Sequence, residues 1–207
     1  MRKVYILHVL LSFFLLSGVC SATIITGPLA VDFRNMSWAG ANGQASYSVG
    51  PVTAVAGPGE DTLYQDGVDG LGILGGEPDE INAGEILAIV FNTPLPLSGV
   101  WITDLFAGPD GGNGETGQVT VFNTGAGPSI FPFWGNNADQ GNGEIFVDFG
   151  GNILLDGAIF EITGEQTNNE FSVAGFTVAP VPEPATILMI GCGLIGLAGI
   201  GRKKVRL

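Results

Sequence analysis

Two long apolar runs stand near the ends of this chain, and a region of shorter runs lies between them. Residues 4–19 follow Met1-Arg2-Lys3 and are interrupted only by His8 and serines. Residues 185–201 carry no charge, and a basic cluster follows them. The pattern predicts two apolar segments that flank one folded region.

The central region contains eight short strand-like runs separated by turns rich in Gly, Asn and Pro. They cover residues 29–33, 45–49, 85–92, 100–106, 118–122, 144–149, 158–163 and 171–178. No long segment shows the periodicity of an amphipathic helix. The spacing predicts an all-β fold over residues 23–179, a single antiparallel β-sandwich of jelly-roll-like type. A β-barrel is the alternative.

Two of these runs carry more specific information. Residues 86–91 are continuously apolar, which predicts a central strand buried on both faces. In the last run Phe171 and Val173 share one parity, whereas Phe176 and Val178 share the other. Because side chains alternate along a strand, this change of parity predicts a β-bulge at Ala174-Gly175.

The N-terminal segment has the three parts of a secretory signal peptide. A positive start and an apolar run precede the small residues Cys20-Ser21-Ala22. The pattern predicts that residues 1–22 are removed by cleavage after Ala22. An uncleaved N-terminal anchor is the alternative.

The C-terminal apolar run predicts a transmembrane helix over residues 185–201. At about 1.5 Å per residue it would span roughly 25 Å, close to the ~30 Å hydrocarbon core of a bilayer. A basic tail, residues 202–207, follows it and would stop transfer through Arg202, Lys203, Lys204 and Arg206. Positive charge at both extreme ends places residues 23–181 on the non-cytoplasmic side. A buried core helix is the alternative.

Pro182-Glu183-Pro184 stands directly before this apolar span, and the basic cluster stands directly after it. In this order, behind a signal peptide, the three parts resemble the PEP-CTERM sorting signal of bacterial exosortase substrates. The resemblance covers residues 181–206 and assigns residues 180–184 as the sorting motif. It implies an exported surface protein that depends on the secretion machinery, is anchored transiently in the inner membrane and is processed near the motif by an exosortase. A stiff juxtamembrane linker is the alternative interpretation.

The predicted exported region, residues 23–181, is strongly acidic. It contains 19 acidic residues and one basic residue, Arg34, so its formal charge is 1 − 19 = −18. Such a surface excludes nucleic acid as a partner and attracts divalent cations. The region contains no Cys, His or Lys. This excludes disulfides, His or Cys zinc sites, serine or cysteine nucleophiles activated by His, and Schiff-base chemistry.

Three acidic segments are candidate Ca²⁺ sites, because carboxylate and amide oxygens are the ligands this ion prefers. The first segment precedes the apolar run 86–91, and the other two share the pattern D-x-G-N-G-E. The candidate ligands are Asp79, Glu80, Asp110, Asn113, Glu115, Asp139, Asn142 and Glu144. Solvated loops and ordinary hairpin turns explain the same residues without a metal.

The segment Phe131-Pro132-Phe133-Trp134-Gly135-Asn136-Asn137 joins aromatic rings to amides. Aromatic faces stack on sugar rings, and amides bond sugar hydroxyls, so Trp134, Asn136 and Asn137 are candidate glycan contacts. Packing in the core or its rim is the alternative.

Two classes of function follow for the exported region. The first is a non-enzymatic surface or extracellular-matrix protein, associated with exopolysaccharide or Ca²⁺. The second is a carbohydrate-active hydrolase built on carboxylates alone, for which Asp148 and Glu161 are the candidate pair.

Overall fold

The computed structural model describes residues 29–59, 61–75, 80–106, 114–135, 143–164 and 169–178. The predicted signal peptide, sorting motif, transmembrane helix and basic tail all lie outside these residues. Within the part of the chain that the structure describes, no helix is long and apolar enough to cross a membrane.

The described residues form eleven strands and one 3₁₀ helix. The elements are β1 (Val31–Asp32), η1 (Met36–Ala41), β2 (Ser46–Val49), β3 (Val52–Gly57), β4 (Thr62–Asp66), β5 (Gly70–Leu74), β6 (Ile81–Asn82), β7 (Ile86–Thr103), β8 (Thr116–Asn123), β9 (Ser129–Trp134), β10 (Ile145–Ile162) and β11 (Glu170–Thr177). The strands pair antiparallel in one sheet, whose main path is β4-β5-β11-β7-β10-β8-β9. The predicted all-β, antiparallel fold is confirmed.

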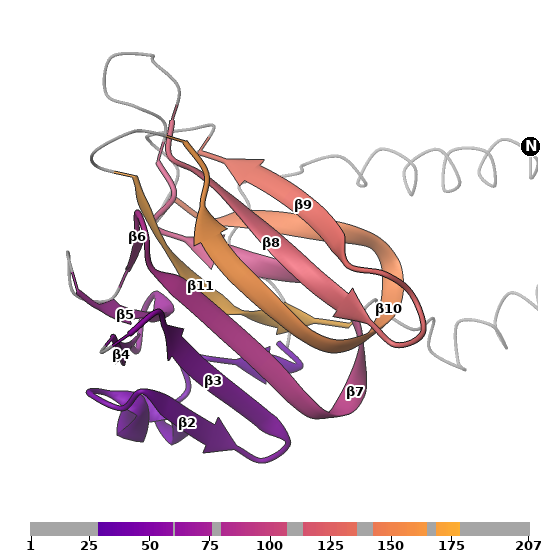
Figure 1. Ribbon diagram of the computed structural model, residues 1–207, viewed down its shortest axis with the longest axis horizontal. Coiled ribbons are helices and arrows are strands. Elements are labelled where there is room, and N and C mark those ends of the chain that lie inside the picture. Colours follow the sequence, from indigo (N-terminus) through magenta and orange to yellow (C-terminus); the bar gives the residue numbers. More distant parts are fainter. Residues whose placement is uncertain are drawn as a thin grey trace, which may run out of the picture.

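Two long strands, β7 and β10, organise this sheet (Figure 1). They pair with each other from Ile145↔Ile102 to Glu161↔Ile86, so they run side by side over nearly their full lengths. The first half of β7 also pairs with β3, whereas its second half pairs with β11. The sequence predicted each long strand as two separate ones, because polar and glycine residues interrupt the apolar pattern at 92–98 and 149–155. The structure instead bends both strands there, with register shifts in β10.

The bends fold the sheet back, so that its two halves face each other around the core. Ring contacts cross between parts of the sheet that do not pair: Phe91, in the half of β7 that pairs with β3, lies 5.5 Å from Phe176 of β11. Phe160 of β10 lies 6.0 Å from the same ring, and Phe133 of β9 lies 5.0 Å from Phe171. Burial of these aromatic rings, each of which removes a large apolar surface from water, holds the two halves together.

Several strands were missed from the sequence because their patterns are weak. In β5 glycines stand at alternate positions, and β9 contains Pro132. Proline lacks a donor for the ladder, but it is tolerated in β9, which ends the main path of the sheet. The bulge predicted at Ala174-Gly175 is confirmed, because the pairing of β11 with β7 shifts register between Val173 and Gly175.

The folded molecule has two distinct ends. We call the end formed by residues 92–98 and 149–155, where β7 and β10 bend, the bend end. We call the opposite end, where β7 and β10 begin and finish, the loop end. The first and last described strands meet toward the bend end, since Ala30 N donates to Phe176 O at 2.8 Å. In Figure 1 the bends lie toward the right, and the loop end lies toward the upper left.

Candidate functional site

A groove lies between β9 and the first half of β10. Its walls are Phe131, Pro132, Phe133, Trp134, Ile145, Phe146, Val147 and Asp148, and its volume is about 300 Å³. The groove exists because each of these strands pairs on one side only among the described residues: β9 with β8, and residues 145–148 with β7. Two strand edges from the facing halves of the sheet therefore border one hollow.

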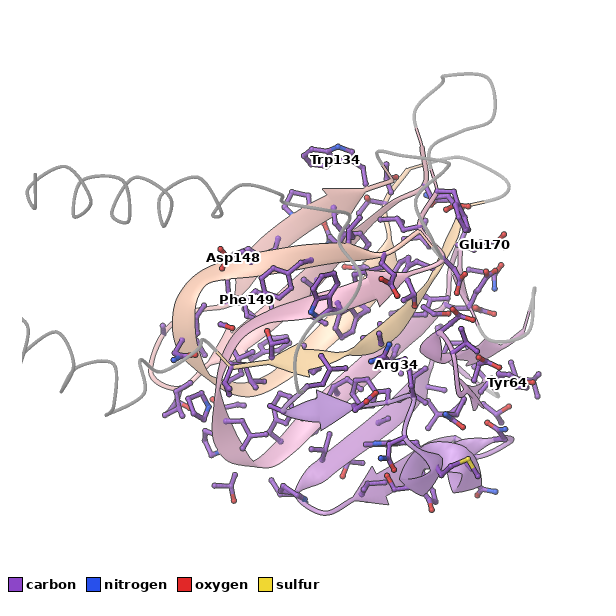
Figure 2. All side chains as sticks on the ribbon, turned by 180° about the vertical axis from the view of Figure 1, so that it is seen from behind. Arg34, Tyr64, Trp134, Asp148, Phe149 and Glu170 are labelled. Carbon is purple, nitrogen blue, oxygen red and sulfur yellow. The ribbon has the colours of Figure 1, made fainter. Side chains whose placement is uncertain are left out.

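Aromatic side chains dominate the groove and its rim. Trp134 is 58% exposed and projects from the surface, as Figure 2 shows. Phe146 is 38% exposed, and its ring packs 5.2 Å from the ring of Trp101. Deeper in, Phe131 packs 5.0 Å from Phe149. Trp101 therefore supports the Phe146 ring from one side, and Trp134 and Phe146 both present exposed apolar faces at the groove.

One carboxylate, Asp148, lies among these rings. Its Oδ1 accepts a hydrogen bond of 2.8 Å from Gly150 N, which orients the side chain while leaving the second oxygen for another donor. An exposed carboxylate beside aromatic faces suits a ligand with apolar faces and hydroxyl donors.

Only one of the two carboxylates proposed for hydrolysis lines the groove. Asp148 lies in the first half of β10 and lines the groove, whereas Glu161 lies near the other end of that strand and is not among the lining residues. Glu161 Oε1 accepts a 2.7 Å hydrogen bond from Gln118 Nε2.

Sequence reasoning found Trp134 but missed Phe146 as a groove residue. Asn136 and Asn137, the other predicted glycan contacts, lie outside the described residues. The position of Phe146 in the sequence could have identified it. It alternates with Ile145, Val147 and Phe149, whose side chains face the core, so its ring must point outward. An apolar ring on the polar face of a strand is the feature that marks it.

Glu115 is a half-buried acid at the loop end with a raised pKa. Its Oε2 accepts a short hydrogen bond from Phe106 N, and its own N–H donates to Phe106 O at 3.0 Å. Burial raises its pKa to about 7; the Phe106 amide opposes this change and the nearby Glu170 carboxylate adds to it. The protonated and ionised forms are therefore both populated near neutral pH.

The described last residues of the two D-x-G-N-G-E segments lie beside the residues that follow β7. Glu115 closes the first against Phe106, while Leu105 N donates to Gly143 O of the second at 3.3 Å. Glu80, Glu115 and Glu144 are described, whereas the other predicted Ca²⁺ ligands, Asp79, Asp110, Asn113, Asp139 and Asn142, lie outside the described residues. Among the described residues, no three side chains of His, Cys, Asp or Glu gather so as to hold a metal ion.

Comparison with known families gives one match: residues 180–203 match the PEP-CTERM protein-sorting motif. Comparison with curated proteins and with solved structures gives no match. This sorting motif implies an exported protein. The chain is a PEP-CTERM sorting-domain protein, and the motif implies processing by an exosortase. The match includes Pro182, Glu183, Pro184, Arg202 and Lys203; Lys204 and Arg206 follow it directly.

Proposed function

We propose that the chain is an exported, non-enzymatic surface or extracellular-matrix protein whose β-sandwich domain is jelly-roll-like. Its signal peptide, residues 1–22, is removed, and the helix 185–201 anchors the precursor in the inner membrane until an exosortase cuts near Pro182-Glu183-Pro184. The observation that carries the proposal is the sorting motif at residues 180–203, directly behind the folded domain.

Mass spectrometry of the C-terminus, on protein taken from the cell surface and medium of the native host, tests this fate. We expect a chain that ends near residues 182–184, bare or joined to an added group whose mass identifies the acceptor. An intact tail through Leu207 on the mature protein would overturn the proposed processing.

The groove supports a polysaccharide as the ligand of the exported domain. Trp134 and Phe146 offer exposed rings for stacking on sugar faces, and the exposed Asp148 carboxylate offers acceptors for sugar hydroxyls. The high negative charge of the domain favours a neutral or cationic polymer over an anionic one. We therefore propose exopolysaccharide as the partner held between β9 and β10.

Retention on exopolysaccharide purified from the host tests this role. We expect Trp134→Ala to weaken retention by about tenfold, because an aromatic–ligand contact of this kind contributes on the order of 1–2 kcal/mol. Phe122→Ala, which removes a partly exposed ring on β8 that does not line the groove, is the matched control. Equal retention of wild type and Trp134→Ala would exclude this site.

The positions of the two candidate carboxylates, Asp148 and Glu161, favour a binding role over hydrolysis. Glycosidases hold two carboxyl groups on either side of one sugar bond, roughly 5–10 Å apart. Only Asp148 lines the groove, and Glu161 is bonded to Gln118 elsewhere on β10. We expect no release of reducing ends from host polysaccharide; release that Asp148→Asn abolishes would instead establish the hydrolase.

Calcium association is proposed for the loop end, where both D-x-G-N-G-E segments adjoin the end of β7. We expect Ca²⁺ to raise the melting temperature more than Mg²⁺ does at equal ionic strength. The reason is that Ca²⁺ binds a larger number of oxygen ligands than Mg²⁺ and tolerates a less regular geometry. Equal increases in melting temperature with the two ions would show only general screening of the negative charge, and would contradict a Ca²⁺ site.

A further inference from the structure

The acidic residues of the exported region are distributed unevenly between the two ends of the fold. Thirteen of the 19 belong to residues that the structure describes, and seven of these thirteen lie at the loop end, in or beside the connections between strands. The seven are Asp61, Glu80, Glu85, Asp104, Glu115, Glu144 and Glu170. The loop end therefore carries more than half of the negative charge of the described residues.

The turns and bends of the bend end contain no charged residue, and two exposed carboxylates flank the β10 bend: Asp148 accepts from Gly150 N, and Asp156 accepts from Thr124 Oγ1. The parts of the bend end are the β2–β3 turn at 50–51, the β7 bend at 92–98, the β8–β9 turn at 124–128 and the β10 bend at 149–155. None of these segments contains an acidic or basic residue. Leu154 and Val178, which are 44% and 45% exposed, add apolar surface there.

The chain leaves the domain at the bend end. The last residues of β11 pair with β7 next to its bend, through Thr177↔Gly99, and Ser98 Oγ contacts Thr177 Oγ1 at 3.2 Å. Only seven residue steps separate Val178 from Ala185, the start of the predicted membrane span. Even a fully extended chain covers about 25 Å over that length, so the bend end stays close to the bilayer.

We infer that the bend end is a membrane-facing surface, which lies against the outer face of the anionic inner membrane in the anchored precursor while the acidic loops point away. The eight residues of β11 separate the two ends by roughly 26 Å. This is about three Debye lengths at physiological ionic strength, so lipid charge is screened from the loop end. The reverse orientation would press the carboxylates against anionic lipid. This inference rests on the proposed membrane anchor.

Fluorescence energy transfer to lipid tests the orientation, since the described domain contains no cysteine of its own. The full chain, carrying Cys20→Ser and Cys192→Ser, receives one donor label at Thr93→Cys or Ser129→Cys of the bend end, or at Ala83→Cys of the loop end. All three positions are exposed. The protein is reconstituted, unprocessed, in phosphatidylcholine vesicles with phosphatidylglycerol and a headgroup-labelled acceptor lipid. Flotation first establishes anchoring, and unchanged melting temperatures establish folding.

With roughly 26 Å between the ends, we expect the loss of donor fluorescence at Thr93 and Ser129 to be about twofold greater than at Ala83. Equal losses, or a greater loss at Ala83, in vesicles that float with the protein would overturn the orientation alone. Failure of the protein to float with the vesicles would overturn the membrane anchor, and with it this inference.

Discussion

At the scale of single residues, Glu115 shows how burial changes the chemistry of an ordinary acid. Its side chain caps the Phe106 amide, yet the same position removes it from water and brings it near Glu170. The ionised form is therefore costly in the folded state. Because the pKa rises from 4.5 to about 7 on folding, this cost is absent below about pH 4.5, grows as the pH rises from there to about 7, and is constant at higher pH.

Glu115→Gln removes the charge while keeping an oxygen for the Phe106 amide. We expect the variant to be more stable than wild type at pH 8, by on the order of 1 kcal/mol after allowance for solvent screening of this half-buried group. The difference should vanish near pH 4.5, as measured by urea unfolding at each pH. Glu170→Gln removes the neighbouring charge that helps to raise the Glu115 pKa. In that background the pH at which the stability difference reaches half its full size should therefore be lower. A pH-independent difference between wild type and Glu115→Gln would contradict the account.

At the scale of elements, the bulge in β11 lets apolar side chains on both sides of it face the core. Phe171 and Val173 precede the bulge and Phe176 follows it, and all three are buried. Gly175 has φ +153°, and a Cβ there would overlap the carbonyl oxygen of Val31 in β1. The backbones of β1 and β11 therefore approach closely at this glycine. The bulge turns Phe176 into the core, where its ring meets Phe33, Phe91 and Phe160.

Gly175→Ala should lower the free energy of unfolding by about 2–3 kcal/mol, because it adds steric overlap and an unfavourable backbone angle. Gly127→Ala is the matched control: no atom lies within 4 Å of its Cβ position, so its effect should stay within about 0.5 kcal/mol. Denaturant unfolding measures both. Similar losses in the two variants would show that close approach at Gly175 is unimportant.

At the scale of the whole molecule, self-repulsion opposes folding. The single cation of residues 23–181, Arg34, pairs with Asp32 at 3.2 Å and leaves the other carboxylates uncompensated by basic side chains. We expect the melting temperature to rise by several degrees between about 0.05 and about 0.5 M NaCl, since salt screens like charges. At about pH 4, where many carboxyls are protonated, the rise should shrink. A salt effect that is equal at both pH values would argue against self-repulsion.

Local patterns predicted much of this architecture because they act over a few residues. The change of parity between Val173 and Phe176 predicted the bulge, which the pairing of β11 with β7 confirms. Patterns could not join 85–92 to 100–106, because the intervening proline and polar residues read as a loop. Pairing with β10 keeps that stretch extended, and this contact is remote in sequence.

The sequence by itself determined the all-β class and the destination of the protein. Both depend on local order: short alternating runs in one case, and Pro182-Glu183-Pro184 with its flanking segments in the other. Only the tertiary structure decided that Trp134 shares a groove with Phe146 and Asp148, that Glu161 does not, and that Glu80, Glu85, Glu115 and Glu144 lie at one end of the fold. These arrangements arise when two long strands bend and the halves of the sheet close on a common core, which brings together residues that no spacing along the chain relates.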